Sequence, residues 1–356
     1  MTEPLPTLSS TSATAASNHR ERRSQYWALV WCVLSLLFGV LGYSAAGWQP
    51  DALAALSLIP TWCWLVAGLG TFILSRRMRP RGWLFVMAML WITFTACVIE
   101  EVRSLSRSIW SRIVTPVSIE PRELRLRVVS LNCADGSLRT AREVAAMTPD
   151  IVLLQESPGR HELEQLATEL FGESHGVLWS PDTSIVARWP ITLSERRDHF
   201  VVGRVQPPSN PAFKIVSLRL APPTVRYDLW NPACWREQFA KRKQHNQQLD
   251  ELASLLIESD NVPIILGGDF NAAQHDRSTQ VLRRLGRDTF DIAGRGWGNT
   301  VLNRIPVMRF DQIWASDHFL PLATWAIHSE HSDHRMAVSD LVLTAKRVER
   351  GRNSSP

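Results

Sequence analysis

Two different hydrophobic patterns occupy this chain, and the change between them falls near residue 124. Before it, three apolar runs without a charged residue cover 26–48, 52–75 and 82–99. Each run approaches the roughly 20 residues that a helix needs to cross a bilayer. A cleaved signal peptide would account for only one such run. The pattern therefore predicts three transmembrane helices.

After residue 124, short apolar or alternating runs separated by Gly, Pro and polar residues predict strands, and amphipathic runs between them predict helices. No repeat or linker divides 124–345, which indicates one α/β domain. A stalk at 101–123, a Ser- and Pro-rich basic tail at 1–25 and a polar tail at 346–356 complete the chain. The predicted strands are 124–131, 150–155, 177–180, 184–189, 200–205, 213–220, 262–266, 309–316, 322–328 and 336–343, and the predicted helices are 137–147, 160–170, 236–257 and 278–285.

Charge adds an orientation to this picture. The net charge is +5, and basic residues flank the apolar runs rather than forming one block. Arginines precede the first run and fill the link at 76–81, while the link at 49–51 has none. By the positive-inside rule, the N-terminus and the second link are cytoplasmic, so the domain faces outward from a plasma or inner membrane. Arginines within 103–112 oppose this orientation weakly, because Glu100 and Glu101 dilute them.

Polar side chains stand where several predicted strands end. Asn132 and Glu156 each follow an apolar run, and Asp269 and Asn271 follow Ile264–Leu266 through two glycines. Gly, Asp and Asn also form ordinary turns. Carboxylate and amide oxygens, with no cysteine nearby, suit Mg²⁺ or Mn²⁺. Glu156 has no evident counter-charge in the sequence, which favours it as the main metal ligand.

A second group of candidates lies near the end of the domain. Asp333 and His334 belong to the sequence HSDH before the last apolar strand, and Asp311 lies within RFDQIWAS. A carboxylate on a neighbouring strand can fix the tautomer and orientation of a histidine. Taken singly, each of these residues is more often a surface residue than a catalytic one.

Six blocks in one order, LRVVSLN, DIVLLQES, SIVARWPI, ILGGDFNA, RFDQIW and HSDHRMAV, resemble the endonuclease/exonuclease/phosphatase family over residues 124–345. The resemblance implies a four-layer α/β sandwich of two facing mixed sheets flanked by helices. It also implies a metal-dependent phosphohydrolase. Asn132 and Glu156 would then lie on the metal side, with Glu156 the principal ligand.

The same resemblance gives roles to the remaining candidates. Asp269 would orient or deprotonate the attacking water, and Asn271 would hold the phosphate or that aspartate. Asp311 would orient His334 at the scissile phosphate, and Asp333 would support the metal or the water.

One position departs from the family pattern. Many members carry a histidine at the end of the strand that matches 213–220, where this chain has Arg219. An arginine can bind phosphate through two parallel hydrogen bonds, or it can be a surface residue on an edge strand. The substrate class is therefore open.

The sequence thus predicts a membrane-anchored, Mg²⁺-dependent phosphodiesterase whose substrate is a nucleic acid, a phospholipid or a small molecule. The lipid bilayer is its other partner, and no obligate protein partner is evident. A phosphomonoesterase, a phospholipid head-group hydrolase and a catalytically silent ligand-binding membrane protein are the alternatives.

Overall fold

The computed structural model describes residues 51–75, 82–110, 123–223, 226, 228–257 and 262–344, with isolated positions between 23 and 37. The predicted first span and both tails lie outside these residues, apart from those isolated positions. The chain divides into two units. The first contains the apolar helices α2 (Cys63–Ser75) and α3 (Gly82–Val98), and the second contains Gly47–Leu58 and everything from Glu100 onward.

Two six-stranded mixed sheets form the frame of the second unit. The strand order is β11-β12-β1-β2-β4-β3 in the first sheet and β5-β6-β7-β8-β10-β9 in the second. Each sheet has one parallel pair, β1 with β2 and β7 with β8, and all its other pairs are antiparallel. The strands of the first sheet are β1 (Leu124–Asn132), β2 (Ile151–Gln155), β3 (Gly176–Leu178), β4 (Thr183–Ala187), β11 (Phe319–Ile327) and β12 (Met336–Leu343); those of the second are β5 (Ile191–Arg197), β6 (Phe200–Val205), β7 (Phe213–Arg219), β8 (Ile264–Asp269), β9 (Arg287–Asp288) and β10 (Asp311–Ala315).

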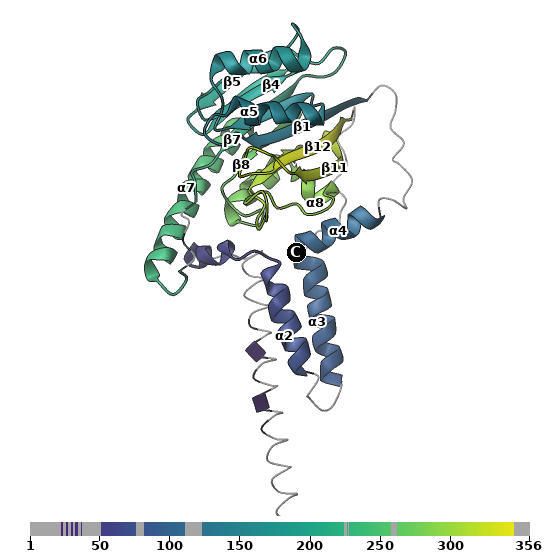
Figure 1. Ribbon diagram of the computed structural model, residues 1–356, viewed down its shortest axis with the longest axis vertical. Helices are drawn as coiled ribbons and strands as arrows, with labels where there is room; N and C mark the ends of the chain where they lie inside the picture. The colour runs from purple at the N-terminus through teal and green to yellow at the C-terminus, as the bar shows by residue number, and fades with distance from the viewer. Residues whose placement is uncertain are drawn as a thin grey trace, which may run out of the picture. The chain divides into compact units, whose positions relative to one another are not determined.

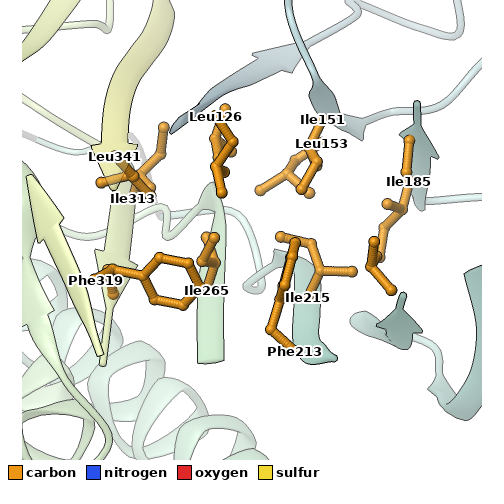
Figure 2. Close-up of a cluster of buried hydrophobic side chains, with 14 of the residues drawn as sticks. Leu126, Ile151, Leu153, Ile185, Phe213, Ile215, Ile265, Ile313, Phe319 and Leu341 are labelled. Atoms are coloured by element: carbon orange, nitrogen blue, oxygen red, sulfur yellow. The ribbon is translucent and has the colours of Figure 1, made fainter. Parts of the chain in front are cut away.

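The two sheets pack face to face over one apolar core. Figure 2 shows Leu126 and Leu153 of the first sheet pointing toward Ile215 and Ile265 of the second. All four side chains are almost completely buried. Alternation along each strand sends the intervening residues to the outer faces, where helices cover them.

Helices complete the four layers. The outer face of the first sheet packs in one apolar cluster with α5 (Leu138–Arg142), the 3-10 helix η2 (Glu143–Met147) and α6 (Arg160–Phe171). The outer face of the second packs with α7 (Pro232–Ile257) and the 3-10 helix η3 (Arg277–Arg284). Figure 1 shows α5 and α6 beside β1 and β4, and α7 near β7 and β8. The predicted sandwich of two facing mixed sheets flanked by helices is confirmed.

The apolar region before residue 100 differs in part from its prediction. The predicted second span, 52–75, is not one helix, because the 3-10 helix η1 (Asp51–Leu58) precedes a break at 59–62 and only then does α2 begin. Pro60 lies in this break, and a proline cannot supply the amide hydrogen that a continuous helix needs. Among the described residues, no helix has both the length and the apolarity required to cross a membrane.

The surfaces of α2 and α3 are nevertheless strongly apolar. Neither helix contains a charged residue. On α2, Val66 is 69% exposed, and on α3, Phe85 is 66% exposed, and several other large apolar side chains are also open. Inside the pair, Gly68 lies so close to Trp91 that an added Cβ would come within 2.6 Å of the indole ring. The two helices therefore pack tightly together and present apolar side chains outward.

Helix α4 (Glu100–Trp110) begins one residue before the predicted stalk and belongs to the second unit. Arg309 is fully buried and donates two hydrogen bonds to Glu100, at 3.0 and 2.6 Å, and one to Asp288 at 2.6 Å. Its guanidinium also lies over the ring of Phe290. A charge this deeply buried requires its partners, so Glu100 is part of the core of this unit.

Candidate active site

The candidate residues come together where the central strands of both sheets end. In the first sheet, Asn132 pairs with Gln155 at the ends of the parallel strands β1 and β2, and Glu156 follows. In the second sheet, Arg219 pairs with Asp269 at the ends of β7 and β8, and Asp311 pairs with Asp269 from the antiparallel β10. Parallel strands in one sheet end at the same edge, and the packing of the sheets brings the two edges together.

Backbone geometry shows that these strand ends are tightly constrained. At Gly268, φ is +150°, and a Cβ would lie 1.9 Å from the carbonyl oxygen of Leu218 in the adjacent strand. Only glycine fits there. Glu156 and Asn271 have φ of +46° and +47°, the left-handed region that non-glycine residues seldom adopt. Such strain persists where surrounding structure enforces it, and it concentrates at functional sites.

Glu156 is held by three donors. Its Oε1 accepts hydrogen bonds from Asn132 Nδ2 at 3.2 Å and from Arg219 Nη2 at 2.7 Å, and its Oε2 accepts one from the backbone N–H of Asp135 at 2.7 Å. Burial alone would raise the pKa of Glu156, but these hydrogen bonds and the Arg219 charge hold it below its usual value. The carboxyl group is therefore ionised at neutral pH. The prediction that Glu156 lacks a counter-charge is wrong, because Arg219 supplies one.

Arg219 joins the site through two carboxylates rather than one. Its Nη1 donates to Asp182 Oδ1 at 2.8 Å, and its side chain is only 21% exposed. This is not a surface arginine on an edge strand, since β7 lies inside its sheet. Asp182 was not among the sequence candidates, and its place in a turn before β4 gives no signal of its role.

Asp269, at the end of β8, connects the two sheets through a hydrogen bond. It is 1% exposed, and its Oδ2 accepts a hydrogen bond from Asn132 Nδ2 at 3.2 Å across the two sheets. The backbone N–H of Asn271 donates to its Oδ1 at 2.9 Å, while the side-chain amide of Asn271 donates to Leu220 O at 2.8 Å. Burial, with help from the negative charge of Asp311, raises the pKa of Asp269 to about 6. A carboxylate of this kind can accept a proton near neutral pH.

His334 and Asp311 form a buried pair beside Asp269. The imidazole Nδ1–H donates to Asp311 Oδ2 at 2.7 Å, and the carboxylate is fully buried. Ligand atoms of the pair and of Asp269 all lie within 4.8 Å of one another. Burial lowers the pKa of His334, but the charges of Asp311 and Asp269 outweigh it and raise that pKa to about 10. The ring is therefore a cation at neutral pH, and Nε2–H can donate away from Asp311.

The loop that carries His334 has further supports that the sequence did not reveal. Ser332 Oγ donates to Asn132 O at 2.8 Å and accepts from the His334 N–H at 3.0 Å. On the other side of the loop, Glu143 accepts hydrogen bonds from Ser329 Oγ and from two backbone N–H groups. Asp333, by contrast, is exposed, and its carboxylate is not in the cluster around Asp269.

The residues present fit a hard divalent cation. Glu156, Asn132 and Asp269 offer carboxylate and amide oxygens, which suit Mg²⁺ or Mn²⁺. Asp311 Oδ1 is buried and, among the described residues, accepts no hydrogen bond, so acceptor capacity remains beside these groups. Glu156 and Asn132 are therefore the side chains that would hold the ion. Arg219 would compete with the ion for one carboxylate oxygen of Glu156.

The sequence pattern described as the Endonuclease/Exonuclease/phosphatase family matches residues 129–334, which is more than half of the chain. The chain belongs to this family. Members of the endonuclease/exonuclease/phosphatase family hydrolyse phosphate esters and typically use divalent metals. The matched region begins within β1 and ends at His334, so it contains every candidate residue named above.

Several solved structures resemble the chain at low identity. A family protein from Bacteroides thetaiotaomicron is 15% identical, with 62% of this chain and 98% of that chain covered and a TM-score of 0.48. A mannosyl-6-phosphatase from the same organism is 16% identical, with 61% and 99% covered and a TM-score of 0.47. Beta toxin from Staphylococcus aureus is 13% identical, with 60% and 99% covered and a TM-score of 0.45. No curated protein sequence matches the chain.

Proposed function

We propose that this protein is a membrane-anchored, Mg²⁺-dependent phosphodiesterase that acts on the outer side of the membrane. The observation that carries the proposal is the position of Asp269. This buried carboxylate accepts a hydrogen bond from Asn132, which also binds Glu156, and it lies within 4.8 Å of the His334–Asp311 pair. A proton acceptor and a cationic donor thus lie close together, as hydrolysis at phosphorus requires.

The reaction assigns a task to each group. Asp269 accepts a proton from a water molecule as the water oxygen forms its bond to phosphorus, and the bond from phosphorus to the leaving oxygen breaks in line. His334 donates from Nε2 to a phosphoryl oxygen and stabilises the charge that develops there, while Asp311 keeps the ring oriented. Because catalysis at phosphorus depends mainly on positioning and charge stabilisation, these fixed groups supply most of what the reaction needs.

Two further groups would bind the substrate and the ion. Held by Glu156 and Asn132, the divalent ion would neutralise phosphoryl charge and lower the pKa of a bound water. Arg219 would contact a non-bridging phosphate oxygen, since its guanidinium is fixed at the same strand ends.

The membrane proposal rests on the apolar helices and on chain connectivity. The uncharged, outward-facing apolar surfaces of α2 and α3 need a nonpolar environment. The arginine-rich link 76–81 joins the two helices, and the positive-inside rule assigns it to the cytoplasmic side. The chain that follows α3 would then lie on the outer side.

Hydrolysis assays on the purified full-length chain in detergent test the chemistry. We expect the protein to cleave bis(p-nitrophenyl) phosphate with Mg²⁺ and to lose that activity in EDTA. Glu156→Gln should lose activity at ordinary Mg²⁺ and recover part of it at high Mg²⁺, with an unchanged melting temperature. Full activity of this variant, or of the wild type in EDTA, would contradict the metal assignment.

A reporter fused after Pro356 tests the orientation. We expect a periplasmic alkaline phosphatase fusion to be active and a fluorescent protein that folds only in the cytoplasm to be dark. The opposite pattern would place the domain on the inner side.

A further inference from the structure

We propose that Thr300 is a positioning residue for the Asp311–His334 pair and that helix α4 holds Thr300 in place. Thr300 is fully buried and lies in the loop between α8 (Thr289–Ala293) and β10. The sequence did not indicate it, because a single threonine in a loop carries no periodic signal. The inference rests on the proposed function and adds a residue that acts through this pair.

The hydroxyl group of Thr300 fixes the backbone that carries Asp311. The backbone N–H groups of Phe310 and Asp311 both donate to Thr300 Oγ1, each at 3.1 Å. The N–H of Phe270, the residue after β8, donates to Phe310 O at 3.0 Å. The start of β10 is therefore held by Thr300 as well as by the neighbouring strand, and the Asp311 side chain projects from a fixed backbone.

The main chain of Thr300 fixes the segment that carries His334. Thr300 O accepts a hydrogen bond from the N–H of Arg335 at 2.9 Å, and the next residue, Val301, forms an isolated β-bridge with His334. Thr300 N–H donates to Met308 O at 2.8 Å, which ties the same residue to the segment before Asp311. Both members of the pair therefore depend on one residue for their backbone positions.

Catalysis by the pair depends on accurate placement of the imidazole. His334 Nδ1 lies 2.7 Å from Asp311 Oδ2, so a backbone shift of either residue lengthens this bond or turns the ring. A turned ring would misplace the Nε2–H that is proposed to donate to a phosphoryl oxygen. A misplacement of about 1 Å can cost about 100-fold in rate. The hydrogen bonds of Thr300 thus act at the two points where such a shift would begin.

Helix α4 holds the loop in which Thr300 lies. Asn299 is 1% exposed, and its Nδ2 donates to Glu101 Oε1 at 3.0 Å. Earlier in the loop, Gly296 O accepts a hydrogen bond from Ser104 Oγ at 2.7 Å. Glu101 and Ser104 are both buried. The placement of the pair thus depends on residues that precede residue 129, where the family match begins.

The test compares variants of the full-length chain in detergent, with bis(p-nitrophenyl) phosphate and Mg²⁺. Thr300→Val keeps the shape of the side chain and removes the oxygen that accepts the two N–H groups. Thr300→Ser keeps that oxygen and removes a methyl group. Thr279→Val is the matched control, because Thr279 is also buried and its hydroxyl donates to the backbone oxygen of Asp276, which is not a candidate site residue.

We expect Thr300→Val to lower kcat about tenfold or more and to leave KM within about twofold, because the donor is misplaced while the groups proposed to bind phosphate stay intact. Thr300→Ser and Thr279→Val should keep kcat within about threefold. In a His334→Ala background, Thr300→Val should cause little further loss, since no imidazole is left to position. Equal losses in Thr300→Val and Thr300→Ser, or multiplicative losses with His334→Ala, would overturn the inference.

Proton NMR of the imidazole N–H tests the position of the ring without any substrate. The proton between His334 Nδ1 and the buried Asp311 carboxylate is protected from exchange with solvent, so it should give a resolved low-field signal that disappears in His334→Ala. Thr300→Val should shift or broaden this signal, whereas Thr300→Ser and Thr279→Val should leave it in place. An unchanged signal in Thr300→Val would overturn the inference even if the activity of that variant falls.

The two measurements separate failure of the inference from failure of the proposed function. A changed N–H signal in Thr300→Val, with no cleavage of the diester by the wild type, rejects the proposed function and leaves the link between Thr300 and the pair standing. Cleavage by the wild type with an equal kcat in Thr300→Val rejects the positioning role alone. If Thr300→Val does not fold, Thr300→Ala takes its place, because it leaves space for a water molecule near both N–H groups. Unfolding of both variants would assign Thr300 to folding alone and overturn the inference.

Discussion

Arg219 is predicted to weaken the binding of a divalent ion while it supports catalysis. Its Nη2 lies 2.7 Å from Glu156 Oε1, the carboxylate proposed as the main metal ligand. A divalent ion held by Glu156 would therefore share this carboxylate with the guanidinium. A single and a double positive charge about 5 Å apart repel by about 2 kcal/mol in a water-like dielectric and by about 7 kcal/mol at an effective dielectric of 20.

The lower figure is the better guide, because the site is partly open and Asp182 neutralises part of the guanidinium charge. About 2 kcal/mol corresponds to more than a tenfold change in a binding constant. Arg219→Gln should therefore bind Mn²⁺ at least tenfold more tightly than the wild type in isothermal titration calorimetry. The same variant should lose kcat/KM for bis(p-nitrophenyl) phosphate, since it also loses a phosphate contact.

Arg142→Gln is the matched control. Arg142 also forms a two-bond pair with a glutamate, Glu169, but on the exposed surface of α5 and α6. Its replacement should leave both Mn²⁺ affinity and activity unchanged. Unaltered or weaker Mn²⁺ binding by Arg219→Gln would refute the competition, and the arginine would then have to be treated as a structural partner of Glu156 alone.

The remaining predictions concern the histidine pair, a strand glycine and a buried histidine. His334→Ala should lower kcat about 100-fold or more, Asp311→Asn should lower it less, and the double variant should be hardly worse than His334→Ala; multiplicative losses in steady-state kinetics would contradict the pair. Gly268→Ala should lose more than about 2 kcal/mol in the free energy of unfolding by urea, because its Cβ would meet a carbonyl oxygen at 1.9 Å, whereas Gly70→Ala, with no atom within 4 Å of the new Cβ, should lose none. Burial lowers the pKa of His245, so the unfolded chain takes up its proton first as pH falls below about 6.5; the wild type should lose more unfolding free energy between pH 7.5 and 5.5 than His245→Gln, and equal losses would count against this.

The central strands could be predicted from sequence because local pattern and tertiary environment agree there. The predictions 200–205 and 336–343 match β6 and β12 to the residue. Strand β5 was missed because its sequence, ITLSERR, is largely exposed at a sheet edge and has apolar residues at only two positions, Ile191 and Leu193. Its pairing with β6 depends on a partner that the local sequence does not specify. The break at Pro60 was missed because the prediction of the second span relied on the uncharged apolar run 52–75 and gave no weight to the proline within it.

The site could be predicted as a set of strand-end residues but not as a geometry. Sequence order indicates which side chains follow strands, and the parallel pairs then bring Asn132 beside Gln155 in one sheet and Arg219 beside Asp269 in the other. The contact of Arg219 with Glu156 crosses from one sheet to the other, so it depends on how the sheets face each other. The hydrophobic periodicity of the sequence does not specify the distance between Arg219 and Glu156. Asp182 and Glu143 were missed for the same reason, since each acts on residues far away in the sequence.

The buried pair of Glu100 and Arg309 shows that the folded unit extends beyond the region matched by the family. The family match begins at residue 129, yet the carboxylate that neutralises Arg309 comes from residue 100. A chain cut at the family boundary leaves a buried guanidinium with one of its two carboxylates, and breaking such a pair typically costs about 3–5 kcal/mol. A shortened, transplanted or fused version of this domain must therefore include Glu100, or Arg309 must be substituted when Glu100 is removed.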